Sequence, residues 1–109
     1  MDPERISDFN ISDVVMSTAS RDKGKLFYVV GTDPVFLFLA NGKDRKLETP
    51  KRKKRKHIQK VLRSETRVAE KLRLGDKVLN SELRRDLAYL RREMQSNNLE
   101  VNELWQKTT

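Results

Sequence analysis

The sequence predicts a mainly β fold: a small β-barrel followed by a C-terminal extension of two helices. Short apolar segments separated by turn signals recur about every 10–12 residues up to residue 61, as they do in small barrels and sandwiches. A barrel is favoured over a sandwich because closing a small sheet removes its exposed edges. After residue 61 helix-forming residues dominate, and neither Pro nor Gly interrupts them before Gly75.

Four or five short strands should build the barrel. The first begins near Asp13 and contains the apolar residues Val14–Met16. The others are expected over Leu26–Val30, over Val35–Ala40, weakly over Lys46–Thr49, and over His57–Val61. Turns are expected at Arg21–Lys25, at Thr32–Pro34 and at Asn41-Gly42, the last being a tight hairpin signal because both central positions of such a turn need positive φ.

Two helices should follow. The first is expected over Glu65–Leu74 and should end at Gly75, a residue type that terminates helices. The second should begin at an N-cap, Asn80 or Ser81, and stop near Ser96–Asn98. The chain then divides into a flexible lead-in (1–11), the barrel with a basic loop at 43–57 (12–62), the helical extension (63–98) and a flexible tail (99–109).

The second helix carries one apolar stripe, made of Leu83, Leu87, Leu90 and Met94. We expect this stripe to pack against the barrel or the first helix. The alternative is a partner surface for a second copy or for a ribosomal protein, and Trp105 in the tail favours that alternative slightly because large exposed aromatics suit interfaces.

Positive charge is concentrated in one segment. The chain has a net charge of +8 and a pI near 10.0. Residues 43–73 hold 14 Lys or Arg and 4 Asp or Glu, a net charge of +10, whereas the remaining residues hold 10 basic and 12 acidic groups, a net charge of −2. Because a basic surface gathers phosphates and steers their approach, this concentration predicts a polyanionic partner.

The composition also indicates a compartment. The absence of Cys excludes disulfides and thiolate metal sites and fits a reducing environment. The charged N-terminus leads into no long apolar run, so we expect no secretory signal. The longest apolar run, Val35–Ala40, is too short to cross a bilayer. We therefore expect a soluble cytoplasmic protein without a membrane partner.

Two segments resemble a known family. Asp13–Gly31 (DVVMSTASRDKGKLFYVVG) resembles the KOW motif, a strand, a turn with a near-obligatory Gly and a second strand within an SH3-like barrel. Asn41–Ile58 (NGKDRKLETPKRKKRKHI) is similar to the segment after the third strand in bacterial KOW-domain RNA-binding proteins related to eukaryotic and archaeal-type large-subunit ribosomal proteins. The resemblance covers about residues 12–61. It implies an SH3-like barrel, RNA binding through loop cations and association with the ribosome.

The candidate RNA-binding residues lie mainly in a turn and in a cation run. The turn Arg21–Lys25 presents three cations beside a glycine that lets phosphate approach the backbone, although an ordinary solvated turn has the same composition. Lys51–Lys56 is a run of six cations, which should repel one another and stay mobile until phosphates neutralise them. A solvated charge run or a nuclear-localisation signal is the alternative for this run. The full candidate set is Arg21, Lys23, Gly24, Lys25, Arg45, Lys46, Lys51, Arg52, Lys53, Lys54, Arg55, Lys56 and His57.

Aromatic residues could add base stacking to phosphate binding. Alternation along the third strand places Phe36 and Phe38 on one face and Leu37 and Leu39 on the other, and we expect the two Phe side chains to be buried. In the second strand, alternation should expose either Phe27 or Tyr28, and Tyr28 is the better candidate for the surface.

The sequence offers no catalytic constellation. It contains no phosphate-binding Gly-rich loop, no nucleophile with a base and no carboxylate pair that spacing would bring together, and the single His57 cannot assemble a metal site. We expect a non-enzymatic protein without a cofactor or a small-molecule substrate, which binds RNA, most naturally ribosomal RNA. Two alternatives remain open: a protein-interaction module of a transcription or translation complex, and a DNA-binding or nucleoid-type protein.

Overall fold

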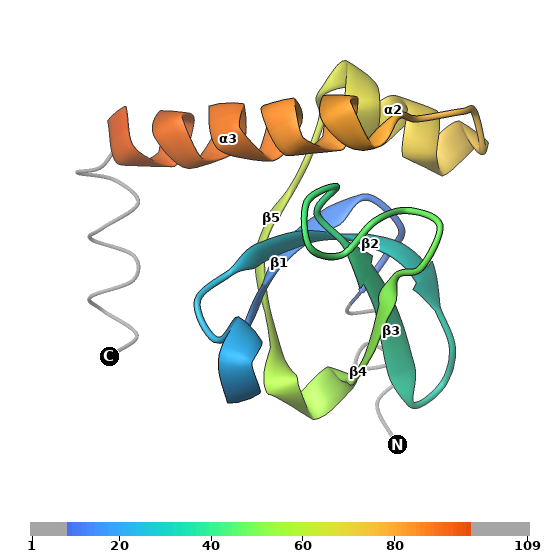
Figure 1. Cartoon of the computed structure of the whole chain (residues 1–109), viewed down its shortest axis with the longest axis vertical. Coiled ribbons are helices and arrows are strands. Elements are labelled where there is room, and N and C mark those ends of the chain that lie inside the picture. The colour runs from blue at the N-terminus through green and yellow to red at the C-terminus, as the bar shows by residue number, and fades with distance from the viewer. Residues whose placement is uncertain (1–8, 97–109) are drawn as a thin grey trace.

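The computed structural model describes residues 9–96, which form a five-stranded antiparallel sheet followed by two helices (Figure 1). The elements are β1 (Asp13–Ser17), the 3₁₀ turn η1 (Ser20–Asp22), β2 (Leu26–Thr32), β3 (Phe36–Ala40), β4 (Lys51–Lys54), the 3₁₀ turn η2 (Arg55–His57), β5 (Ile58–Arg63), α2 (Arg67–Leu74) and α3 (Asn80–Ser96). The expected first, second, third and last strands and both helices are confirmed to within two residues.

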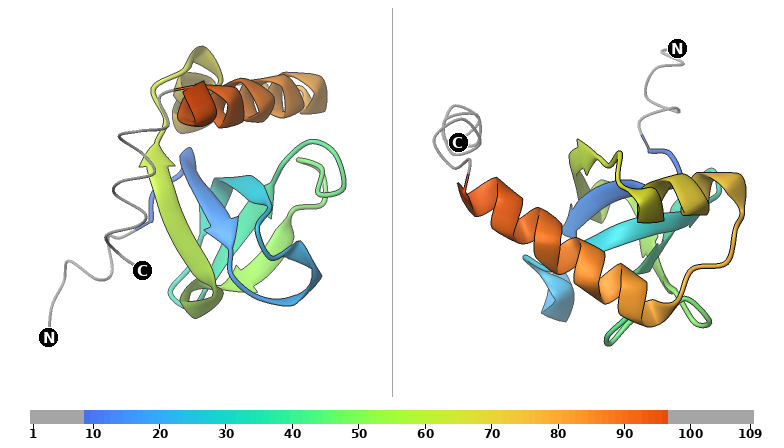
Figure 2. Two further views of the ribbon diagram at one scale, coloured as in Figure 1. Left: turned by 90° about the vertical axis from the view of Figure 1, so that its left-hand side faces the viewer. Right: turned by 90° about the horizontal axis from the view of Figure 1, so that it is seen from above.

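The strand order is β4-β3-β2-β1-β5, and every neighbouring pair is antiparallel. The sheet curls so that η2 carries the chain from β4 into β5, which pairs with β1 (Figures 1 and 2). Within residues 9–96 no ladder joins β4 to β5, so the sheet is curled but not closed. The expected closed barrel is therefore confirmed only as a compact, curled antiparallel sheet.

The fourth strand is not where the sequence predicts it. Lys46–Thr49 forms a turn, in which the Thr49 amide donates to the Lys46 carbonyl at 3.0 Å. The strand consists instead of the cations Lys51–Lys54, paired along β3. The sequence predicts a basic loop over 43–57, and this prediction is wrong for residues 51–54, which form a strand. Lys and Arg have little preference for strands, so only the pairing with an apolar neighbouring strand reveals the element.

The turn at Asn41-Gly42 also differs from expectation. It opens a ten-residue connection between β3 and β4, not a tight hairpin. Gly42 has a φ of +77°, and a Cβ atom on it would lie 2.3 Å from the Asn80 carbonyl oxygen. A glycine is needed here because the N-terminus of α3 approaches the backbone too closely for any side chain.

The curled sheet buries side chains on both faces. Its enclosed face holds one apolar cluster, which consists of Val15, Phe27, Val29, Leu37, Leu39 and Ile58 with Phe9 against it. Its outer face and the helices enclose a second cluster, which includes Val14, Leu26, Tyr28, Ala40 and Ala69. Burial on both faces explains why β1 and β2 are apolar at consecutive positions and do not alternate with polar ones.

The stripe on α3 belongs to this second cluster. Leu83, Leu87 and Leu90 are at most 8% exposed, and Met94 packs against them. The stripe therefore covers the outer face of the sheet, as expected. Its alternative role as a surface for ribosomal or other partners is wrong, because the side chains are already buried within the chain. Trp105 lies outside the described residues.

α3 begins at Asn80, so its N-cap position falls on Leu79, just before the two residues predicted for it. The Leu83 amide bonds the Leu79 carbonyl at 3.0 Å, and the Glu82 carboxylate accepts the Leu79 amide at 2.9 Å. The hydrogen bond from the Leu79 amide and, to a smaller extent, the one from Lys71 lower the pKa of Glu82. The Asn80 side chain is used elsewhere: its oxygen accepts the Leu47 amide at 2.8 Å, and its nitrogen donates to Glu48. Asn80 thus ties the β3–β4 connection to the helix.

A buried polar network joins the helices to the sheet. The Tyr28 hydroxyl donates to Asp86 of α3 and shares a 2.8 Å hydrogen bond with Ser64. Thr66 also donates to Asp86, at 2.8 Å, and accepts the Ala69 amide as the N-cap of α2. The expectation that Tyr28 lies at the surface is wrong, since its exposure is 0%. Burial, then the hydrogen bond to Asp86, raises the pKa of Tyr28.

None of the helices within residues 9–96 combines the length and the apolar character that a membrane span requires.

Replacing Tyr28 with Phe should lower the free energy of unfolding by about 1–2 kcal/mol, because the hydrogen bonds of its hydroxyl with Asp86, Ser64 and Thr66 are lost with little change of shape. Urea unfolding at pH 8 measures this. The wild-type advantage should then shrink as pH rises above 10.0, the ordinary value of the group, because the unfolded Tyr ionises there while the folded Tyr keeps its proton. An advantage that stays constant up to pH 11 would contradict the role of this network.

Candidate nucleic-acid interface

The cation run forms an edge strand in which alternate side chains point to opposite faces. Lys53 is buried, and the side chain of Lys51 is partly buried, on the side of the strand that faces the enclosed core. Arg52 and Lys54 point to the other side and are exposed. Because β4 is ordered by its pairing with β3, these cations are held in fixed positions before any anion arrives.

Lys53 is a structural residue. It is only 8% exposed, and its Nζ donates to Ser17 Oγ at 3.0 Å, to the Ala19 carbonyl at 3.1 Å and to Ser20 Oγ at 2.9 Å. These acceptors use all three of its protons. The prediction that Lys53 contacts RNA is therefore wrong: the side chain joins β4 to the segment after β1.

One buried carboxylate gathers cations from three parts of the chain. Asp22 of η1 is 4% exposed, and its oxygens lie 3.8 Å from Lys25 Nζ, 3.7 Å from an Arg45 terminal nitrogen and 4.0 Å from Lys53 Nζ. Lys25 immediately precedes β2, Arg45 belongs to the β3–β4 connection, and Lys53 lies in β4. The turn at 21–25, the connection and the edge strand are thereby brought together.

Two further candidate residues, Arg55 and His57, make contacts that help to hold the fold together. The Arg55 guanidinium donates to the Asp33 carbonyl through Nε at 3.2 Å and Nη2 at 2.8 Å. His57 is half-buried at the end of η2, and its carbonyl accepts the Thr18 amide at 2.9 Å. The Arg55 side chain and the His57 backbone carbonyl thus hold the β4–β5 corner in place. The exposed cations of the candidate set are Arg21, Lys23, Lys25, Lys46, Arg52, Lys54 and Lys56.

Gly24 takes a φ of +86° in the turn before β2, and nothing lies within 4 Å of the place where its Cβ would be. Gly24 is exposed, but its amide donates to the Ser17 carbonyl at 2.9 Å, so phosphate binding to the backbone of this turn stays a prediction. The neighbouring Lys25 is exposed but paired, with its Nζ 2.6 Å from an Asp44 oxygen. This hydrogen bond, together with one from Asn41, lowers the pKa of Asp44 to about 2, and the same bond raises the pKa of Lys25.

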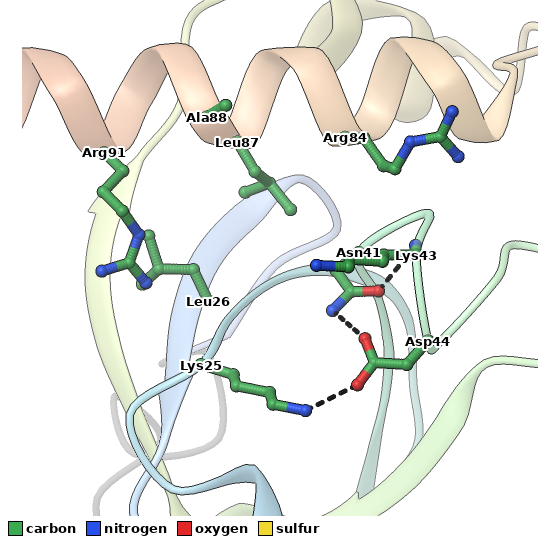
Figure 3. A pocket seen from close by; sticks show the side chains of 9 residues that line it. All are labelled: Lys25, Leu26, Asn41, Lys43, Asp44, Arg84, Leu87, Ala88 and Arg91. Atoms are coloured by element: carbon green, nitrogen blue, oxygen red, sulfur yellow. Dashed lines mark hydrogen bonds and ion pairs between the residues drawn. The ribbon is translucent and has the colours of Figure 1, made fainter.

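A groove that the sequence analysis missed lies between α3 and the β3–β4 connection (Figure 3). Its volume is about 490 Å³, and its floor includes Leu26, Leu87 and Ala88. Cations come from both sides, and only one carboxylate, that of Asp44, lies among the lining residues. The lining cations are Lys25, Lys43, Arg84 and Arg91. The spacing of Arg84, Ala88 and Arg91 places them on one flank of the helix, a signal that could have found them once the adjacent stripe was known to be core.

The faces of β3 are the reverse of those expected. Leu37 and Leu39 are 0% exposed in the enclosed cluster, whereas Phe36 and Phe38 are only partly buried, on the outer face. The guanidinium carbon of Arg52 lies 4.4 Å from the centre of the Phe36 ring. The interface therefore has aromatic rings beside its cations, but they come from β3 and do not include Tyr28.

Within residues 9–96 no group of three or more His, Cys, Asp or Glu side chains could hold a metal ion. Comparison of the chain with known protein families gives no match, and comparison with curated proteins gives none either. The resemblance to KOW-domain proteins therefore stays a proposal.

Adjacent cations of β4 should behave in opposite ways when removed. Lys53→Ala should lower the free energy of unfolding by about 2–3 kcal/mol, because buried acceptors and the Asp22 carboxylate lose their partner. Lys54→Ala should leave stability within about 0.5 kcal/mol, because its side chain is exposed. Urea unfolding of both variants measures the contrast, and equal stabilities would contradict the structural assignment of Lys53.

Proposed function

We propose that this protein is a non-enzymatic RNA-binding protein, which binds ribosomal RNA or associates with the ribosome in the cytoplasm. The observation that supports this most is that the turn at 21–25, the β3–β4 connection and β4 meet at the buried Asp22 through Lys25, Arg45 and Lys53, and that each of these segments also carries exposed cations. A phosphate backbone would meet cations already held in place, so less conformational entropy is lost on binding than for a mobile basic loop.

We further propose that the curled sheet is an SH3-like barrel of the KOW type. Three features support this assignment: the strand order β4-β3-β2-β1-β5, the 3₁₀ turn between β4 and β5, and the glycine of positive φ before β2. The KOW-like segment then corresponds to β1, η1 and β2, and the second resembling segment to the β3–β4 connection and β4.

RNA is favoured over the alternative partners by this resemblance and by the geometry. The α3 stripe offers no surface for a protein partner, because its leucine side chains are buried. A DNA-binding protein could use the same cations. Competition of bound RNA by duplex DNA at equal phosphate concentration separates the two, and equal displacement would argue for general polyanion binding.

The double variant Lys23→Ala Lys46→Ala should weaken RNA binding and reduce its salt dependence. If each side chain neutralises one phosphate, the slope of log K against log salt should fall by about 1.4, at about 0.7 per phosphate of a single strand. Fluorescence anisotropy with a labelled RNA between 50 and 300 mM salt measures it.

The matched control is Arg67→Ala Lys77→Ala, which removes the same charge from exposed positions at the start of α2 and in the linker before α3. That linker lies at the opposite end of the structure from η1, which Lys23 follows (Figure 1), whereas Lys46 lies in the connection that Asn80 ties to α3, so Lys23→Ala against Lys77→Ala is the decisive comparison. A control that loses as much affinity as the test variant would show a response to total charge and would contradict a localised interface.

The groove gives a second, independent test. Arg91→Ala should lower RNA affinity severalfold and reduce the salt slope by about 0.7, because one phosphate contact is lost. Arg92→Ala is the control, since Arg92 is an exposed neighbour that does not line the groove. Titrations like those above measure both variants. Identical binding by the two would exclude the groove from the RNA interface.

A further inference from the structure

The outer face of β3 and β4 carries a small surface of aromatic and cationic side chains, which we call the β3–β4 platform. It consists of Phe36, Phe38, Arg52 and Lys54. In the ladder Phe36 lies opposite Lys54 and Phe38 opposite Arg52, so all of them share one face of the sheet. Both cations are exposed, and both rings are partly exposed.

Core packing does not explain why the platform carries two aromatic rings. The enclosed cluster takes Leu37 and Leu39 from the opposite face of β3, and the cluster beneath the helices takes Ala40 from the same face. Neither Phe36 nor Phe38 is part of either cluster. A strand in a small sheet therefore leaves two large aromatic rings at the surface while its aliphatic neighbours are fully buried.

The rings are held in defined orientations. A Cβ atom on Gly31 of β2 would lie 3.3 Å from Phe38 Cδ2, so the Phe38 ring rests directly on the backbone of the neighbouring strand. The Arg52 guanidinium lies over the Phe36 ring at 4.4 Å. The planar guanidinium and the two rings thus offer stacking surfaces that need little reorganisation.

The charges around the platform favour an anionic ligand with flat groups. Arg52 and Lys54 supply two exposed cations, and the nearby Asp33 carboxylate is already used, because it accepts the amides of Phe36 at 2.7 Å and Val35 at 2.8 Å. These bonds, first that from Phe36, lower the pKa of Asp33. An unpaired nucleotide has both features, because it combines a planar base with a neighbouring phosphate.

We propose that the β3–β4 platform stacks unpaired bases of the bound RNA, with the adjacent phosphates on Arg52 and Lys54. This inference rests on the proposed RNA binding and adds a substrate class to it, because it requires single-stranded segments or loops. Bases within a continuous duplex are stacked on one another and present no free face to the platform.

The experiment compares two labelled RNAs of equal length and phosphate number: an unstructured 12-mer and the same backbone with abasic riboses. Wild-type protein should bind the base-containing RNA at least about fivefold more tightly, the effect of one stacked base at the lower end of its range. Equal affinity for the two would overturn the platform and leave phosphate-directed binding intact. Absence of binding to either RNA would overturn the proposed function as well.

Variants then locate the stacking site. Phe36→Leu Phe38→Leu should remove most of the preference for the base-containing RNA, while the affinity for abasic RNA stays the same. Tyr89→Leu is the matched control, because Tyr89 is an aromatic residue of α3 that is 45% exposed. A preference that survives in the double Phe variant, or that disappears equally in the control, would overturn the assignment to this face.

A second variant guards against a folding defect in the double Phe protein. Arg52→Lys keeps the charge but removes the planar guanidinium, so it should reduce the preference for bases while leaving the salt slope unchanged. Unfolding curves for each variant establish that it is folded at the titration temperature. An unchanged base preference in Arg52→Lys, together with an unchanged preference in any folded single Phe variant, would also overturn the proposal.

Discussion

A cationic strand can join this sheet only because its inward-facing charge is neutralised. Lys53 lies between hydroxyl and carbonyl acceptors and within 4.0 Å of the Asp22 carboxylate. Without these partners a buried ammonium would be too costly to keep, and the strand would leave the sheet. The position of Arg52 and Lys54 on the other face, the corner at η2 and the start of β5 all depend on that pairing. Asp22 therefore has more influence on the surface than its own near-complete burial suggests.

The strands and helices of apolar pattern could be predicted from the sequence, because their burial dictates their composition. β4 could not be predicted, because a run of six cations is not typical of a strand. The strand that pairs with it and the acceptors for Lys53 both come from distant segments of the chain. The faces of β3 were predicted the wrong way round for a related reason. Alternation fixes which side chains share a face, but both faces of this strand carry large apolar residues, and only the register with β2 decides which face is enclosed.

The candidate site shows the same division. The concentration of cations along the chain is visible without a structure. The sequence could not separate the cations that hold the fold, such as Lys53 and Arg55, from those that face solvent. Nor could it find Arg84 and Arg91, which are ordinary exposed residues of an amphipathic helix until the groove beside them is known. Tyr28 was assigned to the surface because strand alternation should expose either Phe27 or Tyr28, whereas both are buried and Asp86 and Ser64 satisfy the Tyr28 hydroxyl.

The open sheet has a further consequence. Its two outer strands, β4 and β5, expose backbone groups that could pair with a strand of another molecule, which is a common route to aggregation. β4 carries the exposed cations Arg52 and Lys54 along that boundary, whereas Lys60 and Arg63 of β5 are paired with Asp13 and Glu65. Like charges on two approaching β4 edges repel, so the residues that attract a polyanion also discourage fibril-like association between copies. Full neutralisation of those charges would remove that protection.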